Sequence, residues 1–241
     1  MKIATQKILT FLLITALFSS CAVDMFNRVN GNRNVVTEDR STKEYFTKIK
    51  VSTGLDLYIS QGSTNQITVE ADENLQDIIL TEVNDGILII YSKKNIWKAK
   101  ARKVYVTIKN LEAIIATSGS DVYTNEALEV NNLNISATSG ADIHVSVDAD
   151  TIETKATSGS NIEVSGASNN HISKATSGAS IDAYQLRSKN VTVKVTSGAN
   201  INVYASESID AKATSGGDID FKGSPKKVNK KTSSGGSVSA K

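Results

Sequence analysis

The chain has 241 residues, enough for one sizeable domain or two small ones, and 39% of them are hydrophobic, so it can bury a core. The formal net charge is only +2, and two of the lysines, Lys2 and Lys7, lie in a leader segment, so the remainder is close to neutral. A global electrostatic attraction to nucleic acid is therefore not expected. A single cysteine, Cys21, excludes a disulfide framework and a cysteine-based zinc site. We expect no cofactor and no metal.

Residues 1–21 have the features of a secretory signal peptide. Two lysines precede the apolar run Ile8–Phe18, which is too short for a stable transmembrane span. The segment Leu17–Cys21 resembles a bacterial lipobox, in which the cysteine is lipidated and becomes the first residue of the mature chain. The alternative is an ordinary cleaved signal peptide that ends near a cysteine. A free thiol in an exported protein is a liability, which favours lipidation of Cys21. We expect an exported lipoprotein of the cell envelope, at the outer membrane or cell surface.

The strongest signal in the chain is internal repetition. A tetrapeptide of Thr-Ser-Gly followed by a small residue recurs at intervals of 18 to 21 residues, with a degenerate last copy. Its glycines are Gly119, Gly140, Gly159, Gly178, Gly198, Gly216 and Gly235. The repeat defines residues 116–241 as one region. Residues 42–115 carry less regular β patterns and are expected to form early coils that cap the stack, and residues 22–41 are expected to be a polar tether.

Each repeat alternates apolar and polar residues, which is typical of a strand with one buried face. Ile162 and Ile201 are predicted to face inward. One unit of about 19 residues cannot bury its apolar face alone, but stacked copies can. The sequence therefore predicts an all-β fold, a right-handed parallel β-helix, because parallel crossovers are almost always right-handed. The alternation also places six serines inside: Ser118, Ser139, Ser158, Ser177, Ser197 and Ser215.

One repeat departs from the pattern at His171. This residue takes the place of an aliphatic residue in the other copies, and Ile172 comes one position late. We interpret this departure as a local bulge.

Several segments before the repeats carry a family resemblance. They are Gly31–Arg40, Phe46–Val51, Gln61-Gly62, Val69–Leu75 and Gly86–Leu88, followed by the Ser-Gly repeats. In this order they resemble the putative auto-transporter adhesin, head GIN domain family of Bacteroidota-type bacteria, over roughly residues 28–223. Arg33 stands where a glycine is usual. The resemblance implies an exported β-helix and supplies no functional residues to carry over.

One segment is a candidate binding patch because basic residues surround the only tryptophan. Its residues are Lys93, Lys94, Trp97, Lys98, Lys100, Arg102 and Lys103. Basic residues beside an aromatic ring can bind phosphate, polysaccharide or lipid head groups. The alternative is a solvated hairpin loop whose Trp97 packs on the coil.

We expect a non-enzymatic surface module, adhesin-like or structural, anchored to the membrane and able to bind a cell-surface glycan or protein. The alternative is a polysaccharide-active β-helix enzyme of the lyase or hydrolase type. Even repeat spacing and short connections favour the first hypothesis. Lysines near the C-terminus would discourage pairing of the last strand with another chain, so we expect a monomer.

Overall fold

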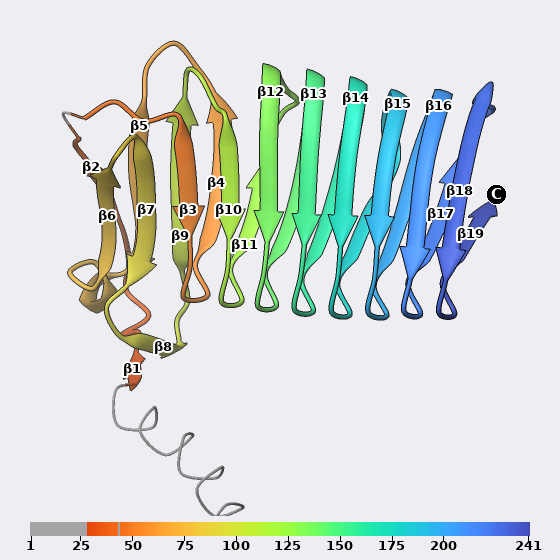
Figure 1. Cartoon of the computed structure of the whole chain (residues 1–241). Coiled ribbons are helices and arrows are strands. Elements are labelled where there is room, and N and C mark those ends of the chain that lie inside the picture. Colours follow the sequence, from red (N-terminus) through yellow and green to blue (C-terminus); the bar gives the residue numbers. More distant parts are fainter. Residues whose placement is uncertain (1–27, 43) are drawn as a thin grey trace, which may run out of the picture.

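The computed structural model describes residues 28–42 and 44–241, and both the signal peptide and Cys21 lie outside this part. Figure 1 shows an elongated stack of strands that advances from the N-terminal end to the C-terminus. The one short 3-10 helix in the described part is η3 (Glu73–Leu75). No helix in these residues is long and apolar enough to cross a membrane.

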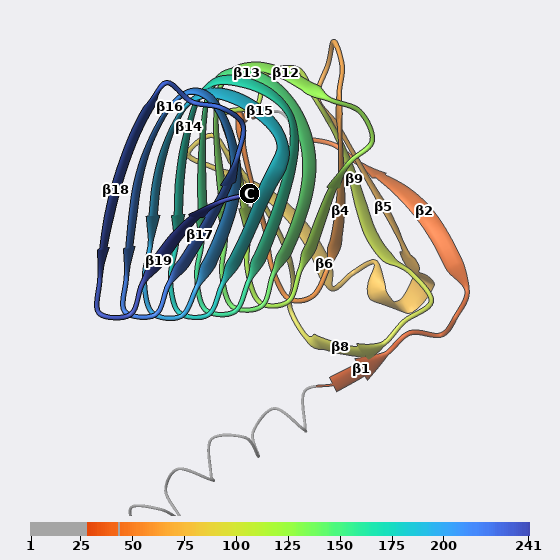
Figure 2. The same cartoon turned by 90° about the vertical axis from the view of Figure 1, so that its right-hand side faces the viewer.

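The regular part of the stack is built from strands that pair in parallel with the next coil. They are β10 (Ala113–Ala116), β11 (Asp121–Thr124), β12 (Leu128–Ala137), β13 (Asp142–Ala156), β14 (Asn161–Ala175), β15 (Ser180–Val195), β16 (Asn200–Thr214), β17 (Asp218–Lys222), β18 (Lys227–Ser233) and β19 (Ser237–Ala240). Each coil rises behind, bends over the top and descends in front while the stack advances to the right (Figures 1 and 2). The predicted right-handed parallel β-helix is confirmed.

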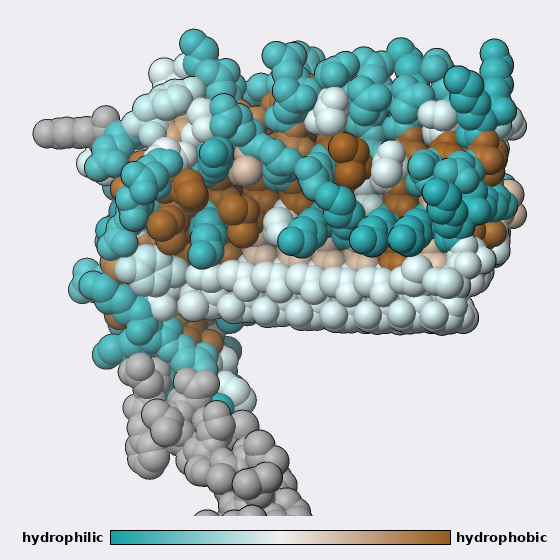
Figure 3. All heavy atoms as spheres, viewed as in Figure 1, coloured by the Kyte–Doolittle hydropathy of each residue, from teal (hydrophilic) through white to brown (hydrophobic). Residues whose placement is uncertain are grey.

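The Thr-Ser-Gly tetrapeptide forms the tight turn at the bottom of every coil. Its serines have φ between 50° and 57° and its glycines between 66° and 76°, which is the pattern of a type I′ turn. In one coil the turn is closed by the Ala199 N–H, which donates to Thr196 O at 3.4 Å. Adjacent turns are also joined, since the Gly198 N–H donates to Ser215 O at 3.1 Å. The turns line up as a continuous pale band along the lower edge in Figure 3.

The serines of these turns are exposed, so the prediction that they face inward is wrong. A type I′ turn turns its central side chains away from the strands it joins. The buried ladder beside the turn is formed instead by the residue after each glycine, as at Ser160 and Ala199. Ser160 Oγ lies 2.9 Å from both Ala137 O and Thr157 O and donates to these carbonyl oxygens, so its hydroxyl is satisfied.

The core is graded in size because the two walls of each coil converge at the turn. Alanine dominates next to the turn, as at Ala156 and Ala213, and branched residues such as Ile162 and Ile201 lie farther away, where the walls separate. Ile162 is 1% exposed and Ile201 fully buried, which confirms the predicted face. Burial of each such side chain contributes about 1.5–3 kcal/mol relative to exposure.

His171 lies in register with its neighbours, so the predicted bulge is wrong. It pairs with Ile152 on one side and Val191 on the other, and its side chain is 1% exposed. Its Nε2 lies 2.9 Å from the Thr154 hydroxyl, which donates to Ser173 Oγ at 2.9 Å. Complete burial lowers the pKa of His171 to about 4, because charging the ring there would require desolvation.

The N-terminal end does not follow the repeat. Its strands are β1 (Arg28–Asn30), β2 (Val35–Arg40), β3 (Lys48–Val51), β4 (Asp56–Gln61), β5 (Gln66–Asp72), β6 (Ile79–Asn84), β7 (Ile87–Ser92), β8 (Asn95–Lys98) and β9 (Arg102–Ile108). Strands β3 and β4 join the stack in parallel through β10 and β11. Strand β5 instead runs antiparallel to both β9 and β2, and β6 forms an antiparallel hairpin with β7. The polar tether expected over 22–41 is therefore wrong for the part described, where β1 and β2 form.

Candidate functional site

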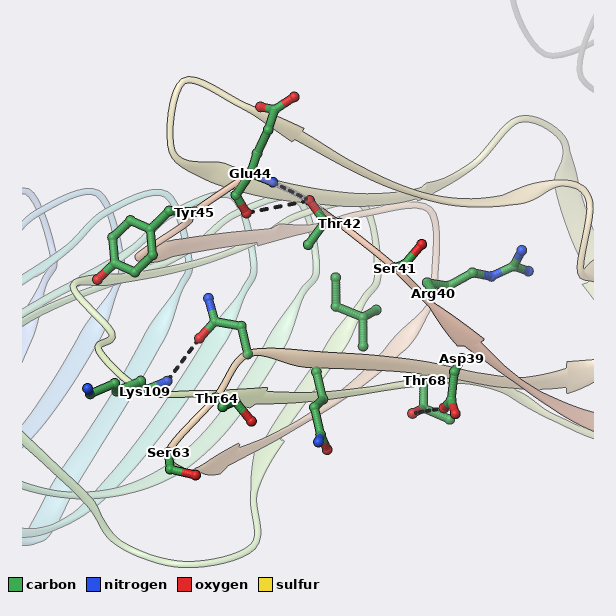
Figure 4. Close-up of a pocket in the computed structure, with 13 residues that line it drawn as sticks. Asp39, Arg40, Ser41, Thr42, Glu44, Tyr45, Ser63, Thr64, Thr68 and Lys109 are labelled. Atoms are coloured by element: carbon green, nitrogen blue, oxygen red, sulfur yellow. Dashed lines mark hydrogen bonds between the residues drawn. The ribbon is translucent and has the colours of Figure 1, made fainter.

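Two hollows are lined by connections that lie at the upper edge of the stack in Figure 1, opposite the turns. The first has a volume of about 690 Å³ and lies between the β2–β3 and β4–β5 connections. Figure 4 shows hydroxyl groups of Ser41, Thr42, Ser63 and Thr64 around it, with Asp39 at one end. Lys109 and Tyr45 stand at the other end.

The second hollow shares Tyr45 and Lys109 with the first and has a volume of about 950 Å³. Its lining is dominated by amide and carboxylate side chains: Gln61, Asn110, Glu112, Glu129, Asn131, Asn132, Asn134 and Asp148. The ring of Tyr45 is the most exposed large hydrophobic side chain in the described residues, at 63%. It therefore stands on the ridge where the two hollows meet.

Local hydrogen bonds hold this ridge in place. The Asn110 amide donates to Tyr45 Oη at 3.1 Å. Gln61 binds the start of β12 through both halves of its amide, donating to Glu129 O at 2.9 Å and accepting from Glu129 N at 2.8 Å. Asn65 accepts from the Lys109 N–H at 3.1 Å. The connections that line the hollows are thus tied to one another and to the first coils.

The chemistry of the hollows suits a hydrophilic ligand with many hydroxyl groups. Amides supply a donor and an acceptor side by side, and carboxylates supply acceptors, which together match neighbouring hydroxyls on a sugar ring. An exposed tyrosine such as Tyr45 adds an apolar face with a polar tip. The volumes lie in the range of about 300–1,000 Å³ that small-ligand sites occupy.

The basic segment singled out in the sequence is divided by the structure. Arg102 lies over the turn of Thr53 and Gly54, and Lys103 pairs with Glu70 at 3.7 Å on the outer sheet. The other five residues lie on or beside β8 and are exposed. With Arg28 of β1 they form what we call the basic edge: Arg28, Lys93, Lys94, Trp97, Lys98 and Lys100.

Trp97 does not pack on the coil. Its neighbour Ile96 points into the core at 5% exposure, whereas Trp97 is 55% exposed on the outer side of β8. The guanidinium of Arg28 lies 4.2 Å from the centre of its ring. Strand β8 pairs in parallel with β1, with Val29 opposite Ile96. The basic edge is therefore at the place where the chain enters the fold, at the lower left of Figure 1.

Asp72 fixes this edge to the rest of the molecule. Its fully buried carboxylate accepts hydrogen bonds from the backbone N–H groups of Arg33, Lys100 and Ala101, at 2.8 to 3.0 Å. Gly31 passes so close that an added Cβ would lie 1.9 Å from Asp72 Oδ2. Arg33 has φ 66°, in the left-handed region that favours glycine. The opening motif Gly31–Asn34 is thus explained by a backbone that wraps around a buried carboxylate.

A column of stacked rings, which the sequence analysis missed, runs across the outer face of the first coils. Tyr105, Tyr58, Tyr123 and His144 lie at ring separations of 5.1, 5.3 and 5.4 Å. Their faces cover one another, so they offer edges to solvent. The signal was present in the sequence, because Tyr58, Tyr123 and His144 each come four residues after the turn glycine of their coil.

Beside this column, two aspartates stack on adjacent coils. Burial raises the pKa of Asp56. The pKa of Asp121 is raised mainly by burial, and further by the charges of Asp56 and Asp142. The side chain of Arg102 opposes both shifts. These carboxyl groups lie on the face of the sheet and outside both hollows. The described residues contain no group of three or more potential ligands placed to hold a metal ion.

The parallel coil stack with an irregular, hollowed N-terminal end defines the molecule as a β-solenoid. The chain belongs to the family described as putative auto-transporter adhesin, head GIN domain, which matches residues 45–225. The resemblance drawn from the sequence is thereby confirmed.

Solved structures share the same fold. A putative adhesin from Bacteroides fragilis has a TM-score of 0.82 at 20% identity, over 88% of this chain and 100% of that one. A putative lipid binding protein from Parabacteroides distasonis has a TM-score of 0.72 at 20% identity, over 89% and 99%. A putative adhesin from the same species has 0.73 at 22% identity, over 89% and 100%. No curated protein matches the chain.

Proposed function

We propose that the protein is a lipid-anchored, non-catalytic adhesion module of the cell envelope that binds a cell-surface glycan at the two hollows around Tyr45. The observation that carries the proposal is their arrangement. Two polar hollows meet at an exposed, hydrogen-bonded tyrosine, and they open on the edge opposite β1, through which the chain enters the fold. An anchored module of this shape presents its glycan site away from its attachment.

Membership of an adhesin-like family and the fold shared with two structures described as putative adhesins support this reading. Adhesion needs many weak polar contacts rather than an enclosed site, and the hollows offer amides, carboxylates and hydroxyls in one continuous surface.

Binding of the purified mature chain to an array of bacterial and host surface glycans tests the glycan site. Tyr45→Ala should lower the affinity for the glycan that binds by about tenfold or more, since an exposed aromatic anchor contributes on the order of 1.5 kcal/mol. Tyr91→Ala, at a surface tyrosine of β7 that contacts neither hollow, serves as the matched control.

An equal loss for the two variants would show that the tyrosines act through folding, and an unchanged affinity for Tyr45→Ala would place the glycan elsewhere.

Anchoring is tested separately. Cys21→Ala should release the protein from the membrane fraction, and a native protein whose intact mass matches unmodified cleavage would refute the anchor.

A further inference from the structure

The basic edge combines positively charged side chains with a tryptophan. These residues form no part of the coil stack or of the hollows. Its five cations and one tryptophan are all exposed. Within the described residues, none of the five cations forms an ion pair. Two carboxylates lie at the same corner, Asp72 and Glu73, and both accept hydrogen bonds from neutral N–H groups instead of pairing with these cations. Five cations against these two carboxylates leave the edge with net positive charge.

The distance to the proposed anchor is short. Arg28 is the seventh residue after Cys21. Even fully extended, seven residues span at most about 25 Å. A lipid on Cys21 would therefore hold β1, and β8 beside it, within that distance of a bilayer. The Debye length at physiological salt is about 8 Å, so the basic edge gains attraction to lipid head groups only if it turns toward the surface.

We infer that the basic edge docks on the membrane that carries the anchor, with Trp97 at the interface and the surrounding cations on anionic phospholipid head groups. Tryptophan is favoured at membrane interfaces because its ring is apolar and its N–H is polar. One lipid chain alone gives only marginal, reversible binding, and a basic patch is a common second contribution to stable attachment. The inference rests on the proposed anchor for its orientation, and its consequence is that the Tyr45 hollows point away from the bilayer.

The test uses the mature chain from residue 21 with Cys21→Ser, which keeps every described residue and cannot be lipidated. It is mixed with vesicles of phosphatidylglycerol and phosphatidylcholine in equal parts, and with vesicles of phosphatidylcholine alone. Because Trp97 is the only tryptophan, its emission reports on the edge directly. We expect sedimentation with the anionic vesicles only, a blue shift of the emission, and quenching when the phosphatidylcholine is brominated.

The charge contribution is tested with a matched pair of variants. Lys93→Ser with Lys94→Ser should weaken association with anionic vesicles about 25-fold, at roughly fivefold for each lysine. Lys155→Ser with Lys194→Ser, two exposed lysines on the coils, should change it less than about twofold. Circular dichroism checks that each variant is folded.

Three results would overturn the inference: equal loss for the two lysine pairs, binding without any change in Trp97 emission, or release of the vesicles by millimolar inorganic phosphate. A fourth result would also overturn it, by showing that the basic edge is covered by the segment of the same chain between Cys21 and Arg28. In that case Trp97 emission is already blue-shifted in buffer and moves to longer wavelength in Phe26→Ser, a substitution between Cys21 and Arg28. The result is independent of lipidation, so failure of the anchor at Cys21 and failure of this docking surface are distinguished.

Discussion

The coils from Ala113 onward and the N-terminal end up to Leu111 use the same core but differ in what they expose. In the coils, many outward residues are followed by a similar residue on the next coil, as at Asp142, Asn161 and Ser180. A surface made of such rows is even along its length. At the N-terminal end the antiparallel strands and long connections break the rows. The first hollow and the basic edge lie there, and the second hollow spans the junction between this end and β12 and β13 of the first coils. Repetition stabilises the stack, and the candidate sites lie where the repetition is broken.

The largest effect should come from charging the core of the coils. Ile201→Asp places an unpaired carboxylate in a fully buried position and should lower the free energy of unfolding by more than about 4 kcal/mol in a denaturant titration. Asn200→Asp is the neighbouring control on the outer face. Because it lies opposite Asp218, we expect a cost of at most about 1 kcal/mol. Similar losses at the two positions would contradict the assignment of faces.

The equivalent test of the N-terminal end is Asp72→Ala. It leaves the buried N–H groups of Arg33, Lys100 and Ala101 without their acceptor and should cost about 3–4 kcal/mol. Amide hydrogen exchange should accelerate around β1 and β8 while the turns of the coils stay protected. Asp39→Ala, at an exposed carboxylate that accepts only from Thr68, is the control. Uniform acceleration along the whole stack would show that the two regions unfold as one.

Both the predictable and the unpredictable parts of the fold have physical reasons. The coil stack was predictable because one apolar alternation recurs at constant spacing. The serines were predicted on the wrong face because a turn of two residues leaves the alternation of the flanking strands in phase. Apolar and polar positions therefore continue to alternate across Ser197 and Gly198 without a visible break. The Tyr45 hollows could not be predicted, since they depend on antiparallel pairing of β2 with β5 across residues far apart in sequence. The basic segment stays a prediction as a binding patch, and its division between β8 and β9 follows only from the pairing of β8 with β1.

A titration of stability against pH tests the contribution of His171, the buried titratable residue of the coil core. The pKa of His171 falls from 6.5 in the unfolded chain to about 4 in the folded one, so between these values only the unfolded chain binds the proton. Stability should therefore fall by up to about 3 kcal/mol as the pH drops from 6.5 to 4. His171→Val, which matches Val191 in the next coil, should remove this slope. His144→Gln on the exposed face should leave it, and a slope that survives His171→Val would assign the proton elsewhere.

The smallest effect on folding is expected at the C-terminal end, which we propose to be protected from pairing by lysines. Replacing Lys226, Lys227, Lys230 and Lys231 by serine should change the free energy of unfolding by no more than about 0.5 kcal/mol for each exposed position. The freed edge of β18 should then support concentration-dependent association, visible by light scattering. A variant that stays monomeric while losing binding to cells would move the adhesive surface to this end.

The central claim, that binding belongs to the irregular end and the coils serve as its scaffold, is tested most directly by amide hydrogen exchange with the bound glycan. We predict protection confined to the connections around Tyr45, Gln61 to Gln66 and Lys109 to Glu112 and to Glu129 to Asn134 of β12, with no change in the coils beyond Asp148. Protection that runs along the Thr-Ser-Gly turns or the outward rows of β14 to β16 would contradict the account.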